Sequence, residues 1–189
     1  MQELARRIQF NSDESAFNQL YKLNVVRLYQ FSYSFVKEKE VAEEIVNDVF
    51  LKVWMDRTKL DTIRNLTVYL YVAVKNASLN HLNRVASKRT SFMNTYAQSF
   101  KLLISGPNPE QLLIGKEMKV SIEQAINQLP PRCRLIFKML KEDGLSANEV
   151  AQILDISNKT VFAQLSIAIK KIEEMLSKVE VFELPDSFK

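Results

Sequence analysis

Apolar and polar positions alternate most regularly between residues 129 and 172, where the pattern predicts three consecutive helices. Pro131 suits the first position of a helix, because its missing N–H is not needed there. Gly144 can end that helix in the left-handed conformation, which glycine adopts without strain. Ser146 and Glu149 then form an S-x-x-E capping box, a frequent start of a helix. The sequence therefore predicts a second, short helix that begins directly after Ser146.

Asp155, Ile156 and Ser157 are predicted to form the next turn, with Ser157 capping the last helix. Apolar residues at three- and four-residue spacing predict its buried side, which consists of Val161, Leu165, Ala168 and Ile172. The outward side then carries Lys159, Phe162, Ala163, Ser166, Ile167 and Lys170. A short helix, a tight turn and a longer helix are typical of a helix-turn-helix, whose recognition helix enters the DNA major groove. The alternative is a packed three-helix core with a solvated outer face.

The first part of the chain is also predicted to be helical. A short leading helix is indicated around residues 4–8, and a longer one over residues 11–36. Asn11 is the predicted cap of the longer helix, with Glu14 reaching back to it. A third helix is predicted over residues 38–56, and its buried side consists of Val41, Ala42, Ile45, Val46, Val49, Val53 and Trp54.

The opposite side of the 38–56 helix is polar and mainly acidic, and carries Glu43, Glu44, Asn47, Asp48 and Lys52. An acidic strip suits a protein partner with basic side chains, because opposite potentials orient docking. The alternative is a solvated face with local pairs such as Asp48 with Lys52. Spacing alone favours this second interpretation.

A helix capped by Asn65 is predicted over residues 65–84, with a kink or short loop near Asn76, where polar residues interrupt the apolar pattern. This helix lies in an acid-free part of the chain, since residues 62–109 contain six basic and no acidic side chains. The absence of acids favours the approach of a polyanion at residues 64–85, whereas a poorly charged linker is an equal alternative for residues 86–109. Aromatic, amide and basic groups suited to unpaired bases and phosphates are Tyr69, Tyr71, Asn76, Asn80, Arg84, Lys88 and Arg89. Alternatively, the two tyrosines are core residues.

Composition limits the possible classes of protein. The 189 residues are 47% hydrophobic and 25% charged and contain three glycines, which indicates a globular and nearly all-helical chain. A single cysteine, Cys133, makes no internal disulfide and indicates a reducing compartment. No signal peptide or membrane-length apolar stretch is apparent, so we expect a cytoplasmic protein without membrane insertion.

Turn-forming residues mark a predicted boundary between two domains. The apolar pattern decays into Ser, Thr, Asn and Gln after residue 85, and the stretch ends in Gly106-Pro107-Asn108-Pro109, where Asn108 is a predicted helix cap. The predicted fold class is all-α, with two small helical domains joined by a flexible linker, the second a helix-turn-helix domain. The predicted ranges are 1–87 for the first domain, 88–108 for the linker, 109–178 for the second domain and 179–189 for the tail.

In combination these motifs resemble the bacterial RNA polymerase sigma factors of the extracytoplasmic-function (ECF) type. The stretches that carry the resemblance are AEEIVNDVFLKVW at 42–54, YLYVAVKNASLNHLNR at 69–84, LPPRCRLIF at 129–137 and GLSANEVAQILDISNKTV at 144–161. The resemblance implies a protein that binds core RNA polymerase, directs it to promoter DNA and helps to melt the minus-ten element. It further implies an anti-sigma factor as a partner.

The resemblance also implies roles for individual residues. It places Glu44, Asn47 and Asp48 against the clamp helices of the largest polymerase subunit, which overturns the preference for a solvated face. It places Lys75, Asn76, Asn80 and Arg84 near the melted minus-ten element. The residues implied in recognition of the duplex minus-thirty-five element are Asn158, Lys159, Phe162, Ala163 and Lys170. Phe162 either touches a thymine methyl group or packs on a neighbouring helix.

Two other classes of function remain open at this stage. One is a dimeric helix-turn-helix repressor or response regulator, which needs a dimerisation surface and usually a ligand or phosphoacceptor domain. The other is a helical adaptor that binds no nucleic acid. An enzyme is not indicated, because His81 and Cys133 are the only residues of their types and no Gly-rich phosphate loop is present. We therefore expect no metal and no cofactor.

Overall fold

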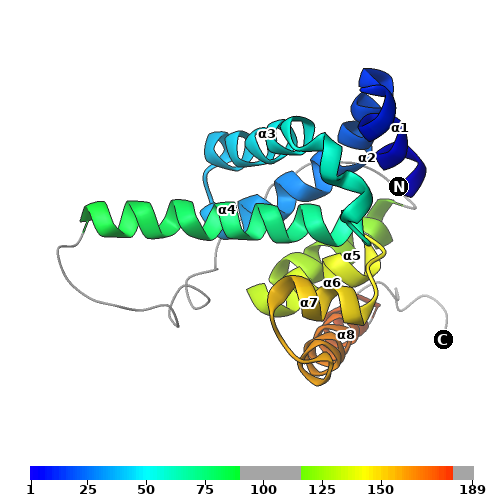
Figure 1. Ribbon diagram of the computed structural model, residues 1–189. Helices are drawn as coiled ribbons and strands as arrows, with labels where there is room; N and C mark the ends of the chain where they lie inside the picture. Colours follow the sequence, from blue (N-terminus) through cyan, green and yellow to red (C-terminus); the bar gives the residue numbers. More distant parts are fainter. Residues whose placement is uncertain (90–115, 181–189) are drawn as a thin grey trace, which may run out of the picture. The chain divides into compact units, whose positions relative to one another are not determined.

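A computed structural model describes residues 1–89 and 116–180 as helices and short turns, with no strand in this part of the chain (Figure 1). These residues belong to two compact units. The first contains α1 (Gln2–Asn11), α2 (Glu14–Val36), α3 (Lys39–Met55), the 3-10 helix η1 (Arg57–Thr62) and α4 (Leu66–Arg89). The second contains α5 (Lys116–Gln128), α6 (Pro131–Lys141), α7 (Ala147–Leu154) as far as Ala151, and α8 (Asn158–Glu180). The predicted all-α class is confirmed.

In the first unit, α2 is the central helix and packs against both α3 and α4, while α1 packs on η1 and α2. Aromatic rings join α2 to α4: the ring centroids of Phe31 and Tyr71 lie 4.9 Å apart in an edge-to-face arrangement. A polar pair lies in the same interface, where the buried hydroxyls of Ser32 and Ser78 are 3.0 Å apart. Ser78 also donates to the Val74 carbonyl at 2.8 Å, so the Ser32 hydroxyl is left to donate to Ser78.

The cap predicted for the second helix is wrong. Asn11 is the last residue of α1, and α2 begins after Asp13, whose Oδ1 accepts a 2.9 Å hydrogen bond from the Ala16 N–H. The guanidinium of Arg7 binds the other oxygen of Asp13 at 2.7 Å. A charged carboxylate held by both groups is a stronger cap than the neutral Asn11 amide.

The kink predicted near Asn76 is also wrong, because α4 is one continuous helix that runs past Arg84 to Arg89. Among the polar residues of its interior, Asn76 and Asn80 are exposed to solvent. Ser78 is buried, and its hydrogen bonds to Val74 and Ser32 satisfy it inside the fold. Neither kind of polar residue therefore interrupts the backbone hydrogen bonds of the helix.

In the second unit most of the predicted local signals are confirmed. Pro131 occupies the first position of α6, and Gly144 adopts a φ of 71° after it. The C-cap of α6 is Glu142 in a right-handed conformation, so Gly144 lies in the turn that follows and does not itself cap the helix. The Leu145 N–H binds the Met139 carbonyl six residues back at 3.0 Å and closes this turn. The core contains Leu129, Cys133, Ile136, Met139, Val150, Val161 and Ala168, all with less than a tenth of their surface exposed.

The helix-turn-helix follows the predicted boundaries. The Ser146 Oγ accepts from the Glu149 N–H, and the Glu149 carboxylate accepts from the Ser146 N–H at 2.8 Å, so both halves of the capping box are present. Asp155 ends α7 with a φ of 55°, a left-handed conformation that Asp tolerates better than most residues. Ser157 accepts from the Thr160 N–H at 3.1 Å and caps α8.

The predicted linker residues 90–108, the predicted cap Asn108 and the tail after residue 180 lie outside the described residues. Within the described part, none of the helices combines the length and the apolar character that crossing a membrane requires.

Candidate docking and nucleic-acid surfaces

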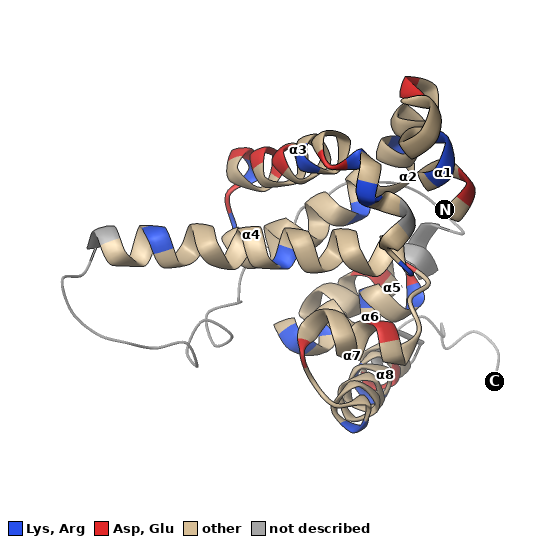
Figure 2. Cartoon of the chain, in the orientation of Figure 1, with Lys and Arg blue, Asp and Glu red and all other residues tan. Residues whose placement is uncertain are grey.

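The outward strip of α3 is arranged as its spacing predicts. Glu43, Glu44, Asn47, Asp48 and Lys52 are all exposed, while Ile45, Val46 and Val49 are buried against α2 and α4. Figure 2 shows the acidic positions along α3 and none along the described part of α4.

Exposed apolar residues continue the α3 strip, which sequence reasoning missed. Leu51 is 52% exposed and Met55 is 67% exposed. Both lie on the face of Glu44 and Asp48, because residues 44, 48, 51 and 55 recur at three- and four-residue spacing. The strip is thus acidic over its first half and apolar toward its end, a mixture typical of a protein-binding surface rather than of a solvated face.

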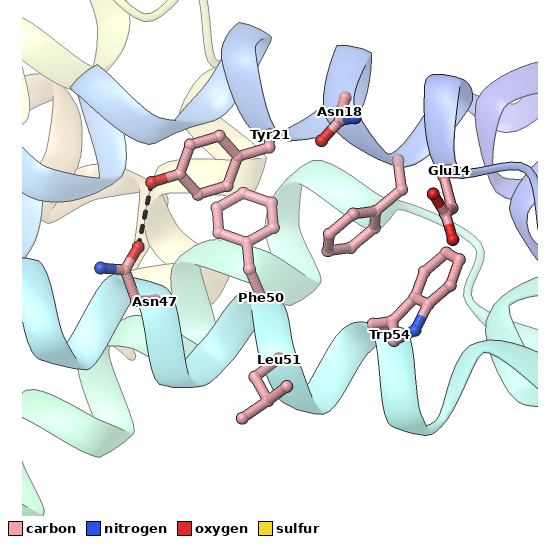
Figure 3. A pocket seen from close by; sticks show the side chains of 8 residues that line it. Glu14, Asn18, Tyr21, Asn47, Phe50, Leu51 and Trp54 are labelled. Carbon is pink, nitrogen blue, oxygen red and sulfur yellow. Dashed lines mark hydrogen bonds between the residues drawn. The ribbon is translucent and has the colours of Figure 1, made fainter.

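A groove runs between α2 and α3 beside this strip (Figure 3). Its larger hollow, of about 420 Å³, is lined by Glu14, Phe17, Asn18, Tyr21, Asn47, Phe50, Leu51 and Trp54. A second hollow of about 190 Å³ is lined by Tyr21, Val25, Val26, Tyr29, Glu43, Val46 and Asn47. The two hollows share Tyr21 and Asn47, so we treat them as one α2–α3 groove.

Aromatic contacts form the floor and one end of the α2–α3 groove. The ring centroids of Tyr21 and Phe50 are 4.8 Å apart, and those of Phe17 and Trp54 are 5.0 Å apart. The Arg57 guanidinium lies 4.9 Å from the centroid of the Trp54 ring, a cation–π distance. Because these rings pack against one another, the groove has a preformed apolar floor.

Asn47 stands at the rim of the groove in a fixed orientation. Its Oδ1 accepts a hydrogen bond of 2.9 Å from the Tyr21 hydroxyl. Figure 3 shows its amide nitrogen on the side away from Tyr21. Asn47 therefore offers two N–H donors to a partner, beside the acceptors of Glu44 and Asp48.

Helix α4 carries a polar face without acidic residues. Tyr69, Asn76, Asn80 and Arg84 are exposed, and their spacing of seven, four and four residues puts them on one side of the helix. Lys75 is half-buried and lies about 100° around the helix from Asn76. The structure thus brings three of the four predicted minus-ten residues together with Tyr69, and Lys75 lies to one side.

Tyr71 does not belong to this face. It is fully buried against Phe31, so its assignment to a base-stacking surface is wrong and the core alternative holds. Tyr71 lies two positions after Tyr69, and this step turns its side chain by about 200° around the helix to the packed side of α4. Lys88 and Arg89 are helical, and the positions of their side chains lie outside the described part.

The outward face of α8 contains all five predicted duplex-contacting residues. Asn158, Lys159, Phe162, Ala163 and Lys170 are exposed, while Val161 and Ala168 are fully buried. The Asn158 amide donates to Oδ1 of Asn148 at 2.5 Å, which ties the starts of α7 and α8 together. Lys170 lies 3.9 Å from the Glu174 carboxylate, an exposed pair that contributes little to stability.

Cys133 is a core residue, as its surroundings show. It packs with Leu129 and Ala168, and its thiol donates to Oε1 of Gln164 at 3.1 Å. Burial raises the pKa of the Cys133 thiol, which disfavours the nucleophilic thiolate. Within residues 1–89 and 116–180 no group of three or more His, Cys, Asp or Glu side chains is placed to hold a metal ion.

Residues in both units match models of known protein families. Residues 20–88 match the family model of sigma-70 region 2, and residues 119–172 match that of sigma-70 region 4. The chain is 28% identical over 185 residues to the ECF RNA polymerase sigma-E factor of Escherichia coli strain K12, covering 91% of this chain and 92% of that protein. It is 24% identical over 157 residues to the ECF RNA polymerase sigma factor SigW of Bacillus subtilis strain 168, covering 79% and 82%. The chain belongs to the ECF sigma factors.

Solved structures share the fold of this sigma factor. CnrH, in complex with the cytosolic domain of CnrY, has a TM-score of 0.55 at 18% identity and covers 94% of this chain and 97% of its own. The sigma factor RpoE, in complex with the anti-sigma factor NepR from Bartonella quintana, has a TM-score of 0.54 at 21% identity, with 85% and 96% covered.

These surfaces fall largely within the matched regions of the sigma factor. The α3 strip, the α4 face and most of the α2–α3 groove lie in region 2, and the outward face of α8 up to residue 172 lies in region 4. Sequence reasoning found the polar residues of these surfaces from helical spacing. It missed the groove, because Phe17 and Tyr21 of α2 are distant in sequence from Phe50 of α3 and meet it only after the two helices pack.

Proposed function

We propose that this sigma factor binds core RNA polymerase through the α3 strip and the α2–α3 groove, and directs it to promoters. Residues 1–87 then serve polymerase binding and the minus-ten element, residues 109–178 serve the minus-thirty-five element, and residues 88–108 link them. The place of action is the cytoplasm, where the polymerase transcribes. The observation that carries the proposal is the separation of charge in the first unit, with exposed acids on α3 and none on α4.

The α3 strip suits a basic helical segment of the polymerase. Glu44 and Asp48 attract and orient basic side chains, and Asn47 supplies directed donors between them. Leu51 and Met55 lie exposed next to these polar groups and provide apolar area to bury. An apolar centre beside a polar rim is the usual composition of a specific protein interface.

The α4 face suits single-stranded promoter DNA at the minus-ten element. The amides of Asn76 and Asn80 can bond to the edges of unpaired bases, and Arg84 can hold a phosphate. Exposed Tyr69 adds a ring on which a base can stack. Lys75, at the side of this face, supplies positive charge to the backbone of the same strand. In this arrangement α4 stabilises the melted strand and favours promoter opening.

The outward face of α8 suits duplex DNA at the minus-thirty-five element. Its first turns carry Asn158, Lys159, Phe162 and Ala163, and the N-terminal residues of a recognition helix are the ones that reach base edges. Lys170, further along, is placed to contact a phosphate. We further propose that an anti-sigma factor regulates this chain, which the complex of RpoE with NepR supports by analogy of fold.

The proposal is tested by measuring the affinity of the purified full-length chain for core polymerase. Asp48→Lys reverses one exposed charge of the α3 strip and is expected to weaken binding by at least about tenfold. Glu3→Lys makes the same charge change at an exposed position of α1 and serves as the control, with unchanged affinity expected. Binding of the isolated chain to duplex DNA should survive both changes. Equal polymerase affinity of wild type and Asp48→Lys would contradict the docking surface.

A further inference from the structure

The recognition helix α8 presents apolar side chains where a sequence-reading protein usually has hydrogen-bonding groups. Phe162 is 56% exposed and Ala163 is exposed beside it, both in the second turn of α8. In a helix-turn-helix the N-terminal turns of the recognition helix lie closest to the base edges. Phe162 is thus a large apolar group at the position from which bases are read.

The rotation of α8 about its axis is fixed by its core residues. Val161 and Ala168 are fully buried, and Ser157 caps the start of the helix at 3.1 Å from the Thr160 N–H. Phe162 follows Val161 directly and lies about 100° around the helix. The second unit therefore holds the Phe162 side chain outside its core, and internal packing is excluded as its role within this unit.

The chemistry of the major groove leaves one base group that suits this side chain. Phenylalanine and alanine side chains neither donate nor accept hydrogen bonds, so they cannot pair with the polar edges of guanine, cytosine or adenine. The C5-methyl group of thymine is the apolar feature of the groove. The surroundings favour DNA as well, since residues 158–172 contain three lysines and no acidic residue.

We propose that Phe162, supported by Ala163, is a specificity-determining residue that contacts the methyl group of a thymine in the upstream promoter element. This inference rests on the proposed function and names part of the sequence that the chain selects. Lys159 and Lys170 position α8 on the phosphates, and Phe162 favours thymine at one or two base pairs of the element.

The test begins with the full-length chain bound to core polymerase and a pool of duplex DNA with a randomised upstream element. The selected element is expected to contain thymine. Each thymine is then replaced singly by deoxyuridine, which differs only by the missing methyl group. For the wild type we expect an affinity loss of about threefold to fourfold at one or two positions.

Two variants assign the effect to a side chain. Phe162→Ala is expected to bind the thymine and deoxyuridine duplexes equally. Ile169→Ala removes another partly exposed apolar side chain of α8, 38% exposed and about 10 Å further along the axis, and should keep the discrimination. Circular dichroism of both variants confirms that α8 is intact.

The possible failures are distinguishable. An element without thymine, or equal wild-type affinity for thymine and deoxyuridine, overturns the methyl contact while promoter selection stands. Retained discrimination in Phe162→Ala overturns the assignment to this residue. Weaker binding of Phe162→Ala to polymerase without DNA assigns the side chain to a protein contact and also overturns the proposal. If the pool yields no enriched sequence, the proposed function itself fails.

Discussion

The hydroxyl of Tyr21 donates a hydrogen bond of 2.9 Å to Oδ1 of Asn47, across 26 positions of the chain and from α2 to α3. Tyr21 also packs on Phe50, with 4.8 Å between ring centroids, so its hydroxyl is held in place by the floor of the groove. With its Oδ1 on this hydroxyl, the Asn47 amide has both of its N–H donors facing outward.

Removing that hydroxyl should disorient Asn47. Tyr21→Phe keeps the ring and its packing, so we expect the fold to be unchanged and polymerase affinity to fall by a few fold. In an Asn47→Ala background the same change should have no further effect, because the group that Tyr21 orients is gone. Binding titrations of the four proteins with core polymerase measure the coupling. Additive losses would show that Tyr21 does not act through Asn47, and Tyr33→Phe, on the same helix, is the matched control.

Lys159 is predicted to contribute one ionic contact to duplex DNA. Lys159→Ala should lower affinity and reduce the slope of log affinity against log salt concentration by about one, because one fewer counterion is released. The measurement is a salt titration of the full-length chain on the selected duplex. Lys141→Ala, an exposed lysine of α6, should leave the slope unchanged. A Lys159→Ala slope equal to that of wild type would remove this residue from the contact surface.

Gly144 allows a direct test of the left-handed turn that follows α6. Its φ is 71°, and a Cβ added there meets no atom within 4 Å, so the cost of a side chain is conformational only. We expect Gly144→Ala to lower the free energy of unfolding of the second unit by about 1 kcal/mol, and Gly144→Asn by less. Urea denaturation of the full chain measures both. Equal stability of the three proteins would contradict the backbone conformation.

The cap of α2 predicts a response to acid. The hydrogen bond from the Ala16 N–H, followed by that from Arg7, lowers the pKa of Asp13 below its ordinary value of 3.8. Because the folded-state pKa is the lower one, the contribution of Asp13 to stability is present above pH 3.8 and is lost as pH falls through the folded-state pKa. Asp13→Asn should therefore be less stable than wild type at neutral pH and should lose less stability on acidification.

NMR titration of the Asp13 carboxyl, together with unfolding curves at several pH values, checks this expectation. An unshifted titration, or an equal loss of stability in both proteins on acidification, would contradict the cap. Glu3→Gln on α1 is a control, since Glu3 is an exposed acid that caps no helix.

The helix-turn-helix was predictable from sequence because its signals are local. The capping box of Ser146 and Glu149 spans four residues, and Asp155 and Ser157 bound a turn of three residues. Each of these features depends on backbone groups within a few positions, so no knowledge of the packed chain was needed.

Features that depend on packing were not predictable in the same way. Asn11 is the cap that the sequence predicts for the second helix, and the structure has Asp13 there instead, bound by Arg7, whose position depends on the turn between α1 and α2. Ser78 is one of the polar residues behind the kink predicted near Asn76, and its buried partner Ser32 lies 46 positions away in the chain. Tertiary contacts determine both the cap of α2 and the burial of Ser78. The spacing of residues within one helix does not reveal such contacts.

Run-off transcription with purified core polymerase tests the central claim most directly. A reconstituted mixture of core polymerase and this chain should transcribe selectively from a subset of a promoter library, and Asp48→Lys should lower that yield at limiting polymerase while Glu3→Lys should not. Transcripts that do not depend on the added chain would contradict its role in promoter selection. An unchanged yield with Asp48→Lys would contradict docking on the polymerase through the α3 strip.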